Sequence, residues 1–463
     1  MRHYDAVVIG GGMLGCFAAR NLRRWNISTV LLEGESDVCT GVTRSNASII
    51  YAGYDNKVGS LKAAMTVRGN ASFDELCAEL EVPFRRCGSL MVSTGPGADH
   101  VLKKKFDHGI QSGVPGLRLI SGEEAREMEP MLASNILTAL HAPSTGTVNP
   151  WQLGIAAYEN ALHNGCEAML GSRVAAIHRD GAGYIIETDR ETVSCKVILN
   201  CAGLSADKVQ ELLFEPYIRL IPDGADFLIL DKRAKKPGCI IFQESEEKGK
   251  GVTAVPTVDG NLLLGPSQRP LNGRPWATER EGLDFLMESA AKLLPGVDLS
   301  LVIRSFGSVR PNPHRVILKD GEYVPDGKSI GSFCIEHPAP GFYSLIGIKT
   351  PGLTCADQLG QYLAREAAEY LNAGKNMDFD PHRPAIRRGT GPDYHQIVCR
   401  CERITRGEVL EAIARGATTI RGVKHRAGSS MGRCQGSRCI WEIAKILMET
   451  GANPDPLLLT KRS

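Results

Sequence analysis

Four cysteines near the C-terminal end of the sequence have the type and spacing of metal ligands. They form two pairs, Cys399-Arg400-Cys401 and Cys434-Gln435-Gly436-Ser437-Arg438-Cys439. Thiolates bind zinc and iron–sulfur clusters, but structural zinc sites usually use Cys-x-x-Cys pairs, and neither pair has that spacing. Spacing alone leaves three interpretations open: a zinc site, an iron–sulfur cluster, and thiols without a ligand. The other ten of the 14 cysteines are far apart, and we expect them to be small buried hydrophobic residues.

The surroundings of these four cysteines are basic. Between residues 397 and 440 there are nine Lys and Arg and three Glu, an excess of six positive charges in a chain whose net charge is +2. A two-iron cluster held by four thiolates is negatively charged, and more so when reduced, so basic surroundings favour a 2Fe–2S cluster. Contact with nucleic acid or with an acidic partner is the alternative role for these charges. The single nearby aromatic residue, Trp441, does not support nucleic acid.

A second motif, at the N-terminal end, indicates a dinucleotide site. Gly10-x-Gly12-x-x-Gly15 directly follows an apolar strand and opens a helix, and Glu33 ends the next strand. The glycines permit a tight turn, a close approach to a pyrophosphate and close helix–strand packing, while a carboxylate at Glu33 suits the ribose hydroxyls. A glycine-rich turn without a ligand is the alternative. These residues alone do not distinguish NAD from FAD.

The elements that must position these motifs follow from hydrophobic periodicity. We expect strands at 6–9, 29–32, 197–200, 227–230, 261–264 and 341–346, and helices at 14–24, 60–81, 150–164, 278–294 and 354–372. The first two strands and the helix between them form a βαβ unit. Residues 372–396 are rich in proline, glycine and charge without apolar periodicity, which is typical of a linker.

The composition is that of an ordinary globular chain. The 463 residues suggest about three domains, and 43% hydrophobic with 23% charged residues exclude extensive disorder. A net charge of +2 gives no reason to expect nucleic acid or a membrane surface as a partner. The uncharged run 6–19 is interrupted by three glycines and no run reaches about 18 apolar residues. We therefore expect no integral membrane segment and a cytoplasmic location.

Four further stretches resemble FAD-dependent dehydrogenases and oxidases of the D-amino-acid-oxidase/glycerol-3-phosphate-dehydrogenase superfamily. In chain order they are Thr43-Arg44-Ser45-Asn46-Ala47-Ser48, then residues 197–207 with the turn Ala202-Gly203, then Pro256–Pro266, and finally residues 347–354 with Lys349-Thr350-Pro351-Gly352-Leu353-Thr354. The resemblance implies FAD in a Rossmann half, with the isoalloxazine over a second sheet domain. It implies these cofactor-binding residues: Gly10, Gly12, Gly15, Glu33, Thr43, Ser45, Asn46, Ser48, Val174, Ala202, Gly203, Gly352, Leu353 and Thr354.

The fold class that follows is α/β. We expect a Rossmann-like FAD-binding domain (1–85, 145–215 and 340–372) interleaved with an antiparallel-sheet α+β substrate domain (86–144 and 216–339). A linker (373–393) then leads to a small helical C-terminal iron–sulfur domain (394–463). We also expect residues 352–354 to open the helix that follows, so that their N–H groups face negative charge on a reduced flavin.

The C-terminal segment has a resemblance of its own. Residues 399–405, 416–424 and 431–436 look like the 2Fe–2S domain of the bacterioferritin-associated-ferredoxin type. That domain follows flavin dehydrogenases similar to the catalytic subunit of anaerobic glycerol-3-phosphate dehydrogenase. The resemblance implies a 2Fe–2S cluster with Cys399, Cys401, Cys434 and Cys439 as ligands.

Two such cofactors in one chain indicate a direction of electron flow. A flavin accepts two electrons as a hydride, whereas a 2Fe–2S cluster passes one at a time. We therefore expect a dehydrogenase that oxidises a small CH–OH or CH–NH substrate and passes electrons to a partner subunit or protein, with which it would form a hetero-oligomer. Two alternatives stay open: a flavin oxidase that uses oxygen and carries a zinc-binding docking module, and a non-catalytic electron-transfer subunit.

The substrate pocket departs from the resembling group. Tyr51 stands where the group usually has His, Gly224 where it often has Arg, and Lys349 just before the Pro-Gly turn. These departures weaken the case for assigning the family's substrate, glycerol 3-phosphate, to this chain. They admit a 2-hydroxy acid, an amino or imino acid, or another polyol phosphate. Tyr51, Arg310 and Lys349 are the expected catalytic residues: Tyr51 to orient or deprotonate substrate, Arg310 to pair with a carboxylate, and Lys349 to place a cation beside the flavin.

Overall fold

The first sheet contains the N-terminal βαβ unit. The computed structural model describes residues 1–244, 251–271 and 276–451. Strand β1 (Arg2–Ile9), helix α1 (Met13–Leu22) and strand β2 (Thr29–Glu33) form the predicted unit, with β1 and β2 parallel. The second half of β1, residues 6–9, and residues 30–32 of β2 are apolar and buried because both faces of the sheet are covered there.

The strand order of this first sheet is β10-β11-β12-β1-β2-β9, and β22 lies beside β12 with β21 at its other edge. The pairs that join β22, β12, β1, β2 and β9 are parallel, as in a Rossmann-like half. The further strands are β9 (Glu167–Leu170), β10 (Val174–Asp180), β11 (Gly183–Thr188), β12 (Thr192–Asn200), β21 (Cys334–Ala339) and β22 (Phe342–Ile346).

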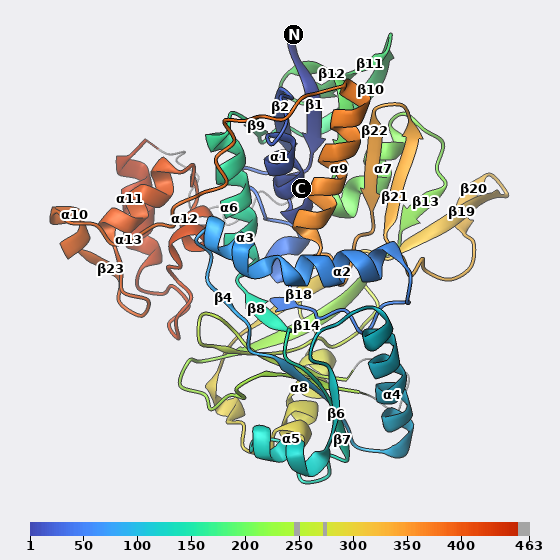
Figure 1. Ribbon diagram of the computed structural model, residues 1–463. Helices are drawn as coiled ribbons and strands as arrows, with labels where there is room; N and C mark the ends of the chain where they lie inside the picture. Colours follow the sequence, from blue (N-terminus) through green and yellow to red (C-terminus); the bar gives the residue numbers. More distant parts are fainter. Residues whose placement is uncertain (245–250, 272–275, 452–463) are drawn as a thin grey trace.

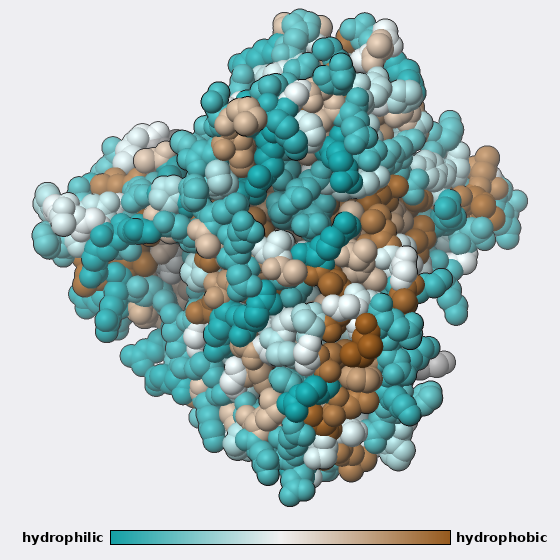
Figure 2. Space-filling model, in the orientation of Figure 1, coloured by the Kyte–Doolittle hydropathy of each residue, from teal (hydrophilic) through white to brown (hydrophobic). Residues whose placement is uncertain are grey.

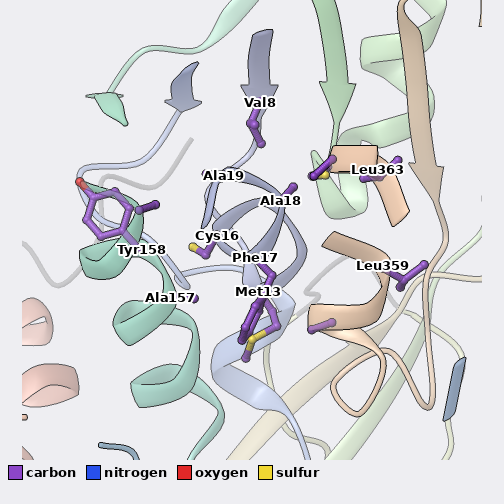
Figure 3. Packing of buried hydrophobic residues seen from close by; sticks show 14 of the residues in the cluster. Val8, Met13, Cys16, Phe17, Ala18, Ala19, Ala157, Tyr158, Leu359 and Leu363 are labelled. Carbon is purple, nitrogen blue, oxygen red and sulfur yellow. The ribbon is translucent and has the colours of Figure 1, made fainter. Parts of the chain in front are cut away.

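Three helices pack on one face of the first sheet. Helix α1 lies between α6 (Pro150–His163) and α9 (Ala356–Leu371), and Figure 3 shows Phe17 of α1 in the core that they share with Tyr158 and Leu359. Phe17 and Leu359 are fully buried. Burial of each such side chain contributes about 1.5–3 kcal/mol, so this packing fixes the helix that begins at the glycine turn.

The second sheet lies below the first in Figure 1 and has the order β18-β14-β17-β16-β15-β5-β7-β6. Its neighbours are antiparallel except for β5 and β15, which are parallel, so the expected antiparallel sheet is mixed at this point. Helices α8 (Arg280–Leu293) and α5 (Gly122–Met128) pack with it. Its strands are β5 (Ser89–Ser93), β6 (Arg118–Ser121), β7 (Thr138–Ala142), β14 (Asp223–Leu230), β15 (Ile240–Gln243), β16 (Thr253–Pro256), β17 (Leu262–Gly265) and β18 (Val302–Arg310).

Two of the predicted helices differ in the structure. The helix expected at 60–81 is two helices, α2 (Leu61–Ala71) and α3 (Phe73–Glu79), because the chain turns at Ser72. The helix expected from residue 354 begins at Ala356, and residues 350–355 form a turn closed by the bond from Gly352 N to the Lys349 carbonyl (2.7 Å). The prediction that residues 352–354 are its first turn is therefore wrong.

Shorter elements connect these parts. Strands β3 (Ile49–Ile50), β4 (Phe84–Arg85) and β8 (Gly146–Val148) form one small sheet, and β13 (Ile218–Leu220), β19 (Pro313–Lys319) and β20 (Glu322–Pro325) form another. The remaining helices described before residue 372 are α4 (Pro96–Gln111), α7 (Ala206–Glu211) and the 3₁₀ turns η1 (Val42–Ser45), η2 (Gly203–Ser205) and η3 (Leu299–Leu301).

The C-terminal module, residues 394–451, has its own small core and lies beside α6 at the left of Figure 1. After the short helix α10 (Pro392–His395) it contains β23 (Ile397–Cys399), β24 (Ile404–Thr405), α11 (Arg406–Ala414), α12 (Ile420–Ala427) and α13 (Ile440–Glu449). The side chain of Thr405 caps α11 in a capping box with Glu408. The face of the molecule in Figure 2 is largely hydrophilic, over the module as well. None of the helices in the described ranges combines the length and the apolar character needed to cross a bilayer.

Candidate active site and cysteine centre

The glycine turn is built so that only glycines fit at two of its positions. Gly10 has φ +101°, and a Cβ there would lie 2.6 Å from the carbonyl oxygen of Cys201. A Cβ at Gly15 would overlap the carbonyl oxygen of Gly10. At Gly12, in contrast, the nearest atom to a Cβ would be Thr43 Oγ1 at 3.7 Å. The start of α1 therefore faces open space, as a site for a pyrophosphate requires.

Glu33 lies directly beside this turn. Its Oε2 accepts a hydrogen bond from Gly11 N (2.6 Å), and its Oε1 accepts one from Glu35 N (2.8 Å). Burial raises the pKa of the Glu33 carboxyl, and these two bonds oppose the rise. Ser172 N donates to the Glu33 carbonyl (2.8 Å), which brings the start of β10, and with it Val174, to the same end of the sheet.

The loop after β2 approaches the start of α1. Thr43 Oγ1 accepts a hydrogen bond from Met13 N at 3.0 Å. Farther along, the Ser45 hydroxyl donates to the Val42 carbonyl (3.2 Å), and Asn46 Oδ1 accepts from Ser48 N (2.8 Å). The side chains expected to bind FAD thus lie on one ordered loop.

The Ala202-Gly203 turn lies against the glycine turn. Ala202 N donates to Asn200 Oδ1 (3.3 Å), and Gly203 has φ +60° with no atom within 4 Å of its Cβ position. Since Cys201 contacts Gly10, the structure brings this turn, Glu33 and the glycines to one edge of the first sheet.

A separate group of cations consists of Lys62, Arg310 and Lys349, and we refer to it below as the cationic pocket. Lys349 Nζ donates to Asn312 Oδ1 and to Ser329 Oγ, both at 3.0 Å. Burial, followed by the positive charges of Arg310 and Lys62, lowers the pKa of Lys349 to about 8. In the described ranges of the chain, no acidic side chain forms an ion pair with any of these three cations.

Lys62 is the pocket residue that sequence reasoning missed. It lies in the first turn of α2, its Nζ donates to the Gly331 carbonyl (3.3 Å), and burial and the charge of Arg310 lower its pKa. A single lysine on an amphipathic helix gives no signal in the sequence. Only the packing of α2 shows that it faces Arg310.

Tyr51 lies between this pocket and the turn before α9. Its N–H donates to Thr354 Oγ1 (3.0 Å), and its ring stacks on Phe242 with centroids 5.9 Å apart. Burial raises the pKa of the Tyr51 hydroxyl, so the phenol stays protonated. A protonated phenol can donate a hydrogen bond, whereas removal of a proton would require the phenolate.

The space beside Gly224, where the resembling group often has Arg, holds the side chain of Arg269. A Cβ on Gly224 would lie 2.8 Å from Nη1 of Arg269, and the two residues exchange backbone hydrogen bonds. The buried guanidinium of Arg269 pairs with Asp226 (3.2 Å) and Glu279 (3.1 Å). Its charge is therefore satisfied within the protein.

The four cysteines lie around a cavity of about 290 Å³ and form two pairs across it. Cys401 Sγ lies 3.5 Å from Cys434 Sγ, and the thiols of Cys399 and Cys439 are hydrogen-bonded to each other. Cys399 ends β23 and Cys439 is the N-cap of α13, while the other two lie in turns.

This arrangement suits two metal ions better than one. Among the described residues, no three His, Cys, Asp or Glu side chains are grouped around a single metal position. Two pairs of thiols are what two bridged irons require, since each iron takes two cysteines. The donation from Cys399, followed by that from the Ser430 hydroxyl, lowers the pKa of Cys439 to about 6, which favours the thiolate. Three arginines also line the cavity, namely Arg400, Arg433 and Arg438.

Comparison with known protein families gives two matches. Residues 5–366 match the model of the FAD dependent oxidoreductase family, and residues 397–449 match the BFD-like [2Fe-2S] binding domain. These matches cover the two sheets with the glycine turn and the four-cysteine cavity, respectively.

Several individual proteins are similar to the chain. It is 37% identical to a glycerol 3-phosphate dehydrogenase of Caloramator mitchellensis, over 96% of this chain and 94% of that protein. It is 24% identical to the anaerobic glycerol-3-phosphate dehydrogenase subunit A1 of Haloferax volcanii, over 96% and 82%. Human mitochondrial L-2-hydroxyglutarate dehydrogenase is 31% identical over 57% of this chain and 60% of that protein. The fold resembles the L-alpha-glycerophosphate oxidase of Mycoplasma pneumoniae, with a TM-score of 0.73 and 21% identity over 83% of this chain and 99% of that one.

Proposed function

The chain belongs to the FAD-dependent oxidoreductase family and ends in a BFD-like [2Fe-2S] binding domain, and from this premise we propose that it oxidises a small hydroxyl-bearing dianion and passes the electrons through its cluster to a partner protein. It is an FAD-dependent oxidoreductase of the glycerol-3-phosphate-dehydrogenase type, and its cofactors are FAD and a 2Fe–2S cluster. The substrate and the acceptor are the parts that we propose.

The observation that supports this substrate class is the group of Lys62, Arg310 and Lys349. The charge of Arg310 lowers the pKa of both Lys62 and Lys349, and none of the three cations has an ion-pair partner in the described ranges, so the group favours a multiply charged anion. Glycerol 3-phosphate meets this requirement and is named by the relative that matches almost the whole chain. An amino or imino acid fits less well, because its nitrogen carries a positive charge.

A second candidate is a 2-hydroxy dicarboxylate. L-2-hydroxyglutarate is also a dianion with a secondary alcohol, and the L-2-hydroxyglutarate dehydrogenases match over more than half of this chain. The same three cations would bind its carboxylates, and the bidentate geometry of Arg310 suits a carboxylate.

We propose the following roles for the chain's own residues. Arg310, Lys62 and Lys349 bind the anionic group, and the protonated Tyr51 orients the hydroxyl. The Thr354 hydroxyl fixes the Tyr51 backbone, and so aligns the pocket with the turn before α9. FAD, when bound, accepts the hydride from the carbon that bears the hydroxyl.

The FAD site that we propose consists of the residues expected from the sequence. The glycine turn, Glu33, Val174 and the Ala202-Gly203 turn lie at one edge of the first sheet, the residues from Thr43 to Ser48 lie in the loop after β2, and residues 352–354 lie in the turn before α9. The full set is Gly10, Gly12, Gly15, Glu33, Thr43, Ser45, Asn46, Ser48, Val174, Ala202, Gly203, Gly352, Leu353 and Thr354.

We propose that the cluster is the exit for electrons. Cys401 is exposed, and the arginines that line the cysteine cavity make the surface around it basic. This surface would suit an acidic face of an electron-accepting partner subunit. The name of the Haloferax volcanii relative, a subunit, supports a hetero-oligomer.

The domain division and the location remain proposals as well. The distribution of strands between the two sheets supports a discontinuous FAD-binding domain (1–85, 145–215, 340–372) interleaved with a substrate domain (86–144, 216–339). Strand β21, at the end of the second range, nevertheless pairs in the first sheet. We place the protein in the cytoplasm on the sequence argument.

An anaerobic substrate panel tests the function. Holoprotein would be mixed with glycerol 3-phosphate, L-2-hydroxyglutarate, lactate, glycerol and proline. Flavin bleaching would be followed without any acceptor, and turnover would be followed separately by reduction of an artificial dye. We expect bleaching by one or both dianions and not by glycerol or proline. Preference for a neutral or zwitterionic substrate would contradict the assignment of the pocket. In an aerobic repeat, rapid oxygen consumption would favour the oxidase alternative. A lack of bleaching by any compound would favour the electron-transfer subunit.

A further inference from the structure

A second group of cations lies where the C-terminal module meets the rest of the chain. Arg44 is on η1, Arg304 is on β18, and Arg421 and Lys424 are on α12, one turn apart. Turn η1 packs against β18, and Arg304 Nη1 donates to Gln435 Oε1 of the module at 3.1 Å.

The first turn of α12 is held close to the loop between β2 and η1. A Cβ on Gly422 would lie only 2.8 Å from Asp37 Oδ2, and the guanidinium of Arg426 pairs with the same carboxylate at 2.6 Å and 2.8 Å. Arg421 and Lys424 are therefore fixed next to the loop that carries Arg44.

These four cations repel one another. Burial lowers the pKa of Arg44 to about 10 and that of Lys424 to about 8, and in each case neighbouring arginines contribute. Glu35 is the carboxylate that acts on Arg44 and Arg421, but no acidic side chain of the described ranges forms an ion pair with any of the four. The ring of Trp276 lies 4.7 Å from the Arg44 guanidinium and limits its contact with water.

The group borders the open space at the start of α1. Arg44 follows Thr43, which accepts a hydrogen bond from Met13 N, and a Cβ at Gly41 would meet no atom within 4 Å. The carboxylate of Glu35 is near these cations, and the backbone N–H of the same residue donates to Glu33 Oε1. The cations thus lie between the glycine turn and the module.

We propose that Arg421 and Lys424 of the module, with Arg44 and Arg304, bind a phosphoryl anion, and that this anion is the diphosphate of FAD. The iron–sulfur module then forms part of the FAD site, and its docking retains the flavin. The proposal requires FAD, which the family binds, and is independent of the proposed substrate and electron acceptor.

The test measures FAD affinity in the full-length protein with its cluster in place. FAD is removed, and FAD fluorescence quenching is titrated for the wild type, R421A, K424A, the double variant and the charge-retaining K424R. The control is K445A, on α13, where Lys445 is exposed and pairs with Glu442. Iron content and cluster absorbance verify that each variant is folded.

We expect Kd for FAD to rise about tenfold for R421A and for K424A, which corresponds to about 1.4 kcal/mol each. K424R and K445A should stay within about twofold of the wild type. Inorganic pyrophosphate should compete with FAD for the flavin-free protein and bind weakly to the FAD-loaded one. Unchanged FAD affinity in the double variant would overturn the proposal. Equal binding of pyrophosphate with and without FAD would instead show a site for a free anion and overturn the assignment to FAD.

Discussion

The buried ion pair between Asp37 and Arg426 joins residues 389 positions apart and attaches the module to the flavin-binding half. Both side chains are almost fully buried, and the guanidinium makes two hydrogen bonds of 2.6 Å and 2.8 Å to the carboxylate. Substitution D37N keeps the size and removes the charge. Loss of one partner of a buried ion pair costs about 3–5 kcal/mol, because the other charge stays buried without compensation.

The structure indicates the lower end of that range. Arg426 Nε also lies 3.6 Å from Glu159 Oε1, so a carboxylate remains near the guanidinium in D37N. Glu159 also pairs with Arg383 at 2.7 Å and with Arg415 at 3.2 Å, so it compensates the charge of Arg426 only in part. We therefore expect a loss of about 3 kcal/mol, or somewhat more than a hundredfold in the population of docked module.

Urea unfolding of the holoprotein would measure this loss, with cluster absorbance as the probe of the module and flavin fluorescence as the probe of the remainder. The matched control is K232M, which removes an exposed contact from Lys232 to Glu402 of the module (2.6 Å) and should cost less than about 1 kcal/mol. The double variant D37L/R426M should recover most of the loss, because apolar residues leave no buried charge. If D37N cost no more than K232M, the reasoning would be refuted.

Three further predictions concern the site. Because the pKa of Lys349 is lowered to about 8, the side chain loses its charge as pH rises through 8. The KM for an anionic substrate should therefore rise above pH 8 in the wild type and stay flat in K349R. A rise of the same size in K349R would contradict this role. C401S should lower iron and acid-labile sulfide below two per chain while flavin content is retained, as measured by colorimetric assay, and an intact cluster would exclude Cys401 as a ligand. G15A should abolish FAD binding in a fluorescence titration, because its Cβ would overlap the Gly10 carbonyl oxygen, and wild-type affinity would show that the turn is not as tight as described.

The sequence was sufficient where a local pattern carries the chemistry. The glycine turn, Glu33 and the four cysteines were identified from spacing, because tight turns and ligand sets use few residue types at fixed offsets. The spacing alone left NAD and FAD open, and likewise zinc and an iron–sulfur cluster; the family matches confirm the FAD and the 2Fe–2S cluster that the resemblances implied.

The sequence was not sufficient where contacts join distant segments. Lys62 and the cations of the module interface have no local pattern, and only folding places α2 near Arg310 and α12 near Asp37. The break at Ser72 was missed because the apolar residues on both sides of it have helical spacing. The start of α9 at Ala356 was missed because the bond from Gly352 N to the Lys349 carbonyl makes a turn that apolar periodicity does not predict.

The ion pair of Asp37 and Arg426 also has a consequence for protein synthesis. A ribosome adds about 5–20 residues per second, so the 389 residues between the two partners take roughly 20–80 s to make. During that time the carboxylate of Asp37, in the loop after β2, has no counter-ion, because Arg426 has not yet been translated. The flavin-binding half, up to Thr354, is therefore complete before Arg426 is made, and the module can dock only after that point.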